Sequence, residues 1–168
     1  MNSTQCLDRK EKFSASDQWR STQPFLFART PNLHLNNPLA MRQQLRDYFV
    51  TTFDRYELLF ETLVNDQAFY EKSIPLRHPL IFYYGHTVTF FVNKLLLTGL
   101  INARINPNFE SIFAVGVDEM SWDDLNDSHY VWPSVANVKN YRNQVGELVI
   151  DLIESAPLQL PIDWNNPW

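Results

Sequence analysis

Residues 79–99 read PLIFYYGHTVTFFVNKLLLTG, and this stretch decides the fold. It begins at a proline and ends at a glycine, as a long helix commonly does. A helix that is apolar on most sides is usually buried, so we expect this one to be the most buried helix of its domain. Gly85, His86, Asn93 and Lys94 interrupt the apolar run, which indicates a buried helix rather than a membrane span.

Two further amphipathic helices are predicted, one on each side of this stretch. Asn37 is a predicted N-cap with Pro38 at the first helical position, and the helix that follows is expected to end near Asn65. Its apolar positions are Leu45, Phe49, Phe53, Tyr56, Phe60 and Leu63. The other helix follows Pro133 and breaks after Ser155. Its apolar positions are Val135, Val138, Tyr141, Val145, Leu148, Val149, Leu152 and Ile153.

The connectors differ in length. Residues 66–78 contain Pro75, which bars a continuous helix. Residues 101–133 have no clear period, and a connector of this length inside a compact domain is usually functional. Short helical turns are predicted in it around Phe109–Phe113 and Asp123–Asp127.

Composition excludes some functions. The net charge is −5 and the pI is about 5.3, which predicts no binding to nucleic acid or to an anionic membrane surface. A single cysteine, Cys6, cannot form a disulfide within the chain. The polar N-terminus does not resemble a secretory signal, so a cytoplasmic protein is expected.

The expected architecture is all-α. Residues 1–36 are expected to form an N-terminal arm. Its aromatic residues suggest that part of the arm packs on the domain. Residues 37–168 form a helical domain with three long helices, each of which needs its apolar face covered. An up-down bundle of this kind would be closed by a fourth helix, so we expect a domain that is incomplete at its C-terminus.

His86 is the most informative candidate for chemistry. At about 100° per residue, its face of the helix is expected to point into the bundle. That face also carries Phe82, Tyr83, Phe90, Asn93 and Leu97. A buried neutral imidazole is a good metal ligand. The alternative is a core histidine satisfied by one hydrogen bond, and spacing alone favours it, because no second ligand lies three or four residues away.

Other candidates have simpler explanations. The remaining histidines are His34, His78 and His129. We expect His78 to cap or pack at a helix start and the other two to be exposed. The long connector carries Asp118, Glu119, Asp123 and Asp124, beside a predicted N-cap at Ser121 that explains the last two. Tyr83, Tyr84 and Tyr130 are candidate proton donors, and Cys6 has no activating context.

Three segments resemble one family. They are RHPLIFYYGHTVTFF (77–91), RINPNFESIFAVGVDEMSWDDL (104–125) and WPSVANVKNYRNQV (132–145). The family is the 5-histidylcysteine sulfoxide synthases of ovothiol biosynthesis, to which the ergothioneine-pathway sulfoxide synthases are related. The resemblance covers most of residues 37–164. Its most specific part is GVDEMSWDDL, whereas the G-H-T segment is shared with the wider DinB-like fold.

The resemblance implies a DinB-like four-helix domain joined to a formylglycine-generating-enzyme-like catalytic domain. It also implies Fe(II) held by three histidines, one of which matches His86. The other two belong to an H-x-x-x-H-x-E motif on the next helix, which these residues do not contain. The implied reaction couples L-cysteine to L-histidine with O₂ and leaves a sulfoxide. This chain alone is therefore expected to be a poor iron binder and an inactive catalyst, whose C-terminal catalytic domain is missing.

Two other functions stay open. Other DinB-like proteins are metal-dependent thiol transferases or hydrolases that use a histidine triad. The chain is alternatively a non-catalytic binding or assembly module, which docks through an apolar face that a fourth helix would cover.

Overall fold

The computed structural model describes residues 19–20, 28–75, 77–114 and 130–168. These residues form helices and connectors without any β-strand, which confirms the all-α class for this part of the chain. The elements are α1 (Pro38–Phe60), the 3₁₀ turn η3 (Asp66–Phe69), α2 (Leu80–Leu97), α3 (Pro107–Ile112) and α4 (Val135–Ser155).

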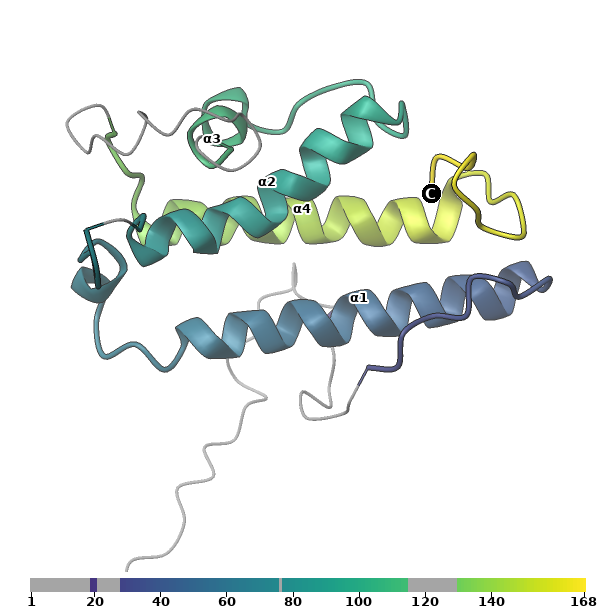
Figure 1. Ribbon diagram of the computed structural model, residues 1–168, viewed down its shortest axis with the longest axis horizontal. Coiled ribbons are helices and arrows are strands. Elements are labelled where there is room, and N and C mark those ends of the chain that lie inside the picture. The colour runs from purple at the N-terminus through teal and green to yellow at the C-terminus, as the bar shows by residue number, and fades with distance from the viewer. Residues whose placement is uncertain (1–18, 21–27, 76, 115–129) are drawn as a thin grey trace, which may run out of the picture.

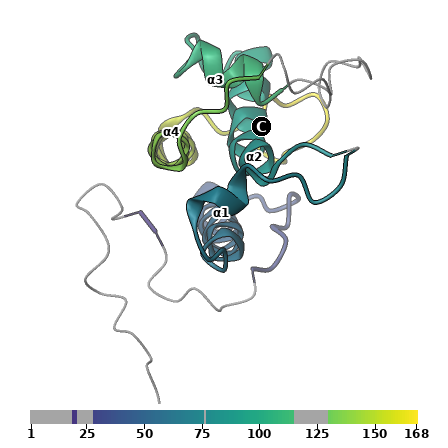
Figure 2. The same ribbon diagram turned by 90° about the vertical axis from the view of Figure 1, so that its left-hand side faces the viewer.

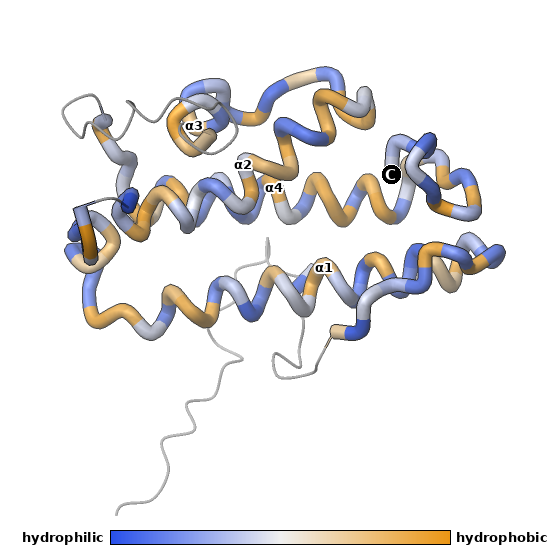
Figure 3. The backbone as a smooth tube through the Cα atoms, viewed as in Figure 1, coloured by the Kyte–Doolittle hydropathy of each residue, from blue (hydrophilic) through white to orange (hydrophobic). Residues whose placement is uncertain are grey.

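The three long helices surround a shared core. Helix α4 packs against both α1 and α2, and α3 packs on α2. Figure 1 shows α1 and α4 running side by side, with α2 crossing α4 at an angle. Figure 2 shows α1, α2 and α4 at the corners of a triangle, with α3 beyond α2 on the side away from α1. Hydrophobic residues recur along all three long helices, as Figure 3 shows.

The helix ends follow the predicted caps. Oδ1 of Asn37 accepts hydrogen bonds from the N–H groups of Leu39 and Ala40 at 3.0 and 3.1 Å. Gly99 follows α2 with a φ of 72°, which glycine adopts without strain. Helix α1 ends at Phe60, earlier than the predicted end near Asn65, because Asn65 instead caps η3.

Helix α2 has one open face. Val88, Val92 and Phe82 lie in the core, whereas Phe90 and Leu97 are exposed. Its outer face is therefore open, although the buried share of α2 (7 of 18 residues) is at least as large as that of α1 (7 of 23) or α4 (8 of 21), in agreement with the prediction of the most buried helix. Helices α4 and α3 pack on different parts of the α2 surface (Figure 2), and within the described residues the face of α2 that carries Phe90 and Leu97 is left open.

Segments from both ends of the chain also pack on the bundle. Trp19 is buried against the rings of Phe49 and Phe53, which confirms that part of the arm packs on the domain. In the tail, the N–H of Ile162 donates to the carbonyl oxygen of Leu33 at 3.1 Å. None of the described helices combines the length and the hydropathy that a membrane crossing requires.

Candidate functional site

The site around His86 is built where α3 docks on α2. Gly85 precedes the histidine and makes the docking close: a Cβ at Gly85 would lie 2.5 Å from ring carbons of Phe113. Phe113 is fully buried and stacks on Trp132, with centroids 6.1 Å apart. The absence of a side chain at Gly85 thus lets α3 approach α2 and brings the main chain of Phe113 within reach of His86.

His86 is held by one hydrogen bond and one ring contact. Its Nδ1 lies 2.7 Å from the carbonyl oxygen of Phe113. A carbonyl only accepts, so the hydrogen must be on Nδ1, and in the neutral ring Nε2 keeps its lone pair. The ring of Phe82 stacks on the imidazole at 5.3 Å with an interplanar angle of 12°. Together these contacts set both the tautomer and the orientation of a half-buried imidazole.

A buried carboxylate fixes α3, and through it the acceptor of His86. Glu110 is 1% exposed, and its Oε1 accepts the N–H groups of Ile105 and Asn106 at 2.8 and 2.9 Å. Its Oε2 lies 3.2 Å from a guanidinium nitrogen of Arg104. These bonds satisfy N–H groups at the start of a helix that is too short to be stable alone. Glu110 is therefore the anchor of the segment that orients His86.

The predicted face of α2 is only partly correct. His86 is half-buried and Phe82 is buried, but Phe90 and Leu97, on the same predicted face, are exposed. The imidazole lies at the α2–α3 contact rather than in the core between the long helices. The prediction that this whole face points into the bundle is therefore wrong, because α3 covers only its first half.

The other described histidines do not form a metal site together with His86. His78 is buried and stacks on Phe82 at 4.1 Å, in an aromatic cluster with Tyr130 and Trp132, which agrees with packing at the start of α2. His34 is exposed, as predicted. Among the residues that the structure describes, no group of three or more His, Cys, Asp or Glu side chains is placed to hold a metal ion.

Several predictions fall outside the described ranges. The predicted turn at Asp123–Asp127, the N-cap at Ser121, His129 and Cys6 all lie there. So do the acidic residues of the long connector, which are Asp118, Glu119, Asp123 and Asp124. Their predicted roles stay predictions.

A buried charged network, which the helical periodicity did not predict, joins the three long helices. Nε of Arg142 in α4 donates to Oε1 of Glu57 in α1, and the Tyr84 hydroxyl of α2 donates to Oε2 at 2.8 Å. Arg142 is 1% exposed, and its Cζ lies 4.5 Å from the centroid of the Tyr84 ring. A signal was present: Arg142 is in phase with the apolar positions Val138 and Val149 of its helix.

Burial changes the acidity of the core tyrosines. Desolvation, and after it the neighbouring Glu57 carboxylate, raises the pKa of Tyr84 far above its ordinary value. Desolvation likewise raises the pKa of Tyr141, and to a smaller extent that of Tyr56. A phenol with a raised pKa holds its proton at neutral pH, so Tyr84 acts as a hydrogen-bond donor to Glu57 and not as a base.

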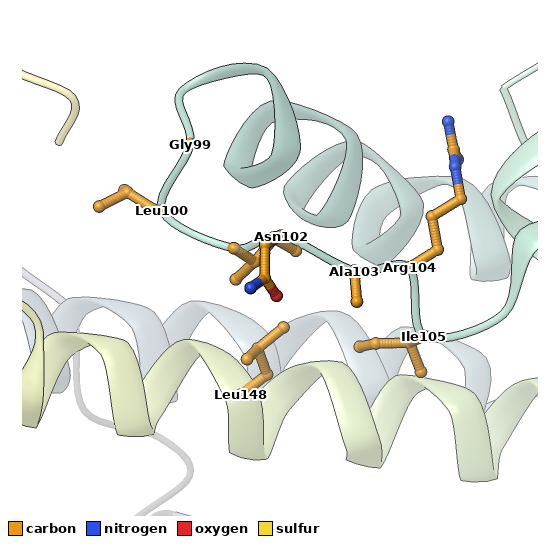
Figure 4. A pocket seen from close by; sticks show the side chains of 8 residues that line it. Gly99, Leu100, Asn102, Ala103, Arg104, Ile105 and Leu148 are labelled. Atoms are coloured by element: carbon orange, nitrogen blue, oxygen red, sulfur yellow. The ribbon is translucent and has the colours of Figure 1, made fainter.

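Among the residues that the structure describes, two hollows lie away from His86. The larger, of about 480 Å³, lies between residues 99–105 and Leu148 of α4. Figure 4 shows Leu148 pointing toward the connector, while the Arg104 side chain points away from α4. This hollow has no imidazole or carboxylate in its lining, so it offers no donor set for a metal. The smaller hollow has Arg142 in its wall.

Comparison with known proteins assigns no relative. No model of a known protein family matches the chain, and no curated protein matches its sequence. The function must therefore be argued from the residues themselves and from the arrangement around His86.

Proposed function

We propose that this chain is the N-terminal, DinB-like part of a non-heme iron, O₂-dependent sulfoxide synthase that couples L-cysteine to L-histidine, with His86 as an iron ligand. The observation that carries the proposal is the hydrogen bond between Nδ1 of His86 and the carbonyl oxygen of Phe113. Metal-binding histidines usually donate their second ring N–H to such a group, which fixes the tautomer and orients the ligating nitrogen. A histidine with a purely structural role does not need a free Nε2. A measurement of metal binding therefore distinguishes a metal ligand from a structural histidine.

The described residues supply only part of the ligand set that iron would need. His86 fits one ligand position, because its Nε2 keeps a lone pair in the neutral ring. The described residues provide no complete set of metal ligands. The proposal therefore requires two further imidazoles from beyond them, on the same polypeptide or on another subunit.

The chain's own contribution to the reaction would be positioning. When bound, Fe(II) supplies the dioxygen chemistry of the coupling, in which the thiol and the imidazole carbon each lose a hydrogen. One oxygen atom goes to sulfur and the other leaves as water. Phe82 stacks on the His86 ring, and the backbone of Phe113 holds Nδ1. A ligand with its ring held in this way needs little reorganisation when the metal binds.

Iron analysis of His86→Ala tests the proposal. In a protein that contains this chain together with the two further ligands, the substitution should abolish tight iron binding and sulfoxide formation from cysteine, histidine and O₂. His34→Ala, at an exposed histidine, is the matched control and should keep both. Retained iron and turnover in His86→Ala would refute the assignment. Zinc or nickel with thiol-transfer activity would instead favour a DinB-like transferase.

A further inference from the structure

The smaller hollow has the composition of a ligand site. Its volume is about 160 Å³, and it lies between α1 and α2 with a residue of α4 in its wall. Its lining includes the aromatic rings of Phe49, Phe53, Tyr56 and Phe91, together with Thr87 and Arg142. An engineered cavity of about 150 Å³ is known to bind benzene, so this space accommodates a body of the size of one ring.

The guanidinium in the wall has unused donors. Nε of Arg142 donates to Glu57, and Nη1 donates to the carbonyl oxygen of Tyr84 and to Oγ1 of Thr87. These bonds use every N–H of those two nitrogens. Among the described residues, the two N–H groups of Nη2 have no acceptor. Nη2 is not among the buried side-chain atoms that lack a partner, so its N–H groups are accessible from the hollow, where an occupant would supply their acceptor.

The surrounding groups select the kind of acceptor. The Thr87 hydroxyl accepts from Arg142 at 2.8 Å and is itself hydrogen-bonded to the Tyr56 hydroxyl, so the unused donors at the hollow belong to Nη2 of Arg142. A carboxylate makes shorter and stronger hydrogen bonds to a guanidinium than a neutral oxygen does. Cζ of Arg142 already lies 4.8 Å from the ring centroid of Phe53 and 5.1 Å from that of Tyr56, so a flat apolar body would continue this stacking.

We propose that this hollow binds a small aromatic carboxylate, with its ring among the phenylalanine rings and its carboxylate on Nη2 of Arg142. The site is independent of the proposed iron site, because His86 is not in its lining.

Titration of the full chain with benzoate tests the proposal. The signals of the Arg142 Nε–H and of the Thr87 and Phe91 amides should shift saturably in NMR spectra. Benzyl alcohol has the same ring without the charge and should bind at least about tenfold more weakly, a difference of about 1.4 kcal/mol. Thr52→Trp places a large ring at the edge of the hollow and should weaken benzoate binding at least about tenfold. Thr62→Trp, at an exposed residue outside the hollow, should leave binding unchanged.

Three results would overturn the proposal. The first is the absence of saturable shifts at these residues in the unmodified chain. The second is equal binding of benzyl alcohol and benzoate, which would show an apolar hollow without carboxylate recognition. The third is unchanged benzoate binding in a folded Thr52→Trp variant. The first two need no variant, so the test does not depend on the folding of a substituted chain.

Discussion

The aromatic ring of Phe113 occupies the space that a side chain at Gly85 would need, since a Cβ there would lie 2.5 Å from the ring. Gly85→Ala should therefore push α3 away from α2 and lower the free energy of unfolding by about 1–3 kcal/mol, the usual cost of overpacking. Urea unfolding followed by circular dichroism measures this change. The helix propensity of alanine alone would have the opposite sign.

A double-mutant cycle identifies the cause. If the clash with Phe113 is responsible, Gly85→Ala should cost much less in a Phe113→Ala background. Equal costs in the two backgrounds would show that α3 docking does not depend on the glycine.

A second prediction concerns the tautomer of the neutral His86 ring. Because Nδ1 donates to a carbonyl, the neutral ring should carry its hydrogen on Nδ1 in nearly all molecules. Nitrogen chemical shifts of the imidazole distinguish the two tautomers in the metal-free chain. The exposed His34 serves as the reference ring in the same spectrum. A predominant Nε2–H form in His86 would contradict the hydrogen bond and remove the main support for iron ligation.

Glu110 should control that tautomer from a distance. Glu110→Gln keeps one oxygen for the N–H groups of Ile105 and Asn106 but puts an N–H₂ group in place of Oε2 beside Arg104, so the ion pair is lost and a buried donor is left poorly satisfied. We expect a loss of about 1–3 kcal/mol in the free energy of unfolding. The Nδ1–H population of His86 should fall as the carbonyl of Phe113 becomes less fixed. Glu154→Gln, in a surface pair with Arg46, should cost no more than about 1 kcal/mol and leave the tautomer unchanged.

The Glu57–Arg142 pair should be costly to break from one side. Glu57→Gln leaves the guanidinium charge buried and uncompensated, and about 3–5 kcal/mol of stability should be lost in denaturant unfolding. Replacing both partners with apolar residues, as in Glu57→Leu with Arg142→Met, should cost less than the single change. If the single change is neutral, the charged pair does not stabilise the bundle.

Stability should fall steeply at high pH. The pKa values of Tyr84 and Tyr141 are raised by burial, whereas the unfolded chain loses these protons near pH 10. Their contribution is complete below pH 10 and is lost as the pH rises further toward the folded-state values. Each tyrosine should lower the free energy of unfolding by about 1.4 kcal/mol per pH unit in that window. Urea unfolding across the window in Tyr84→Phe should show a slope smaller by that amount, and an unchanged slope would contradict the assignment.

Much of the fold is readable from local signals. Asn37 with Pro38, and Gly99 after α2, mark helix ends through chemistry that acts within a few residues. The steps of three and four in α1 and α4 predicted which residues are buried, among them Phe53, Val138 and Val145. The sequence also identified His86 as the candidate metal ligand.

The tertiary structure alone decided what surrounds those residues. Arg142 and Glu57 lie in phase with apolar stripes on different helices, and only the packing of α4 on α1 brings them together. The acceptor of His86 lies 27 positions along the chain, directly after the short helix α3, which docks closely because Gly85 has no side chain. Local periodicity is a property of neighbouring residues, whereas these pairings depend on how whole helices pack. The helix caps and apolar stripes could therefore be predicted from the sequence, whereas the buried charge pair and the orientation of the imidazole depend on how the helices pack.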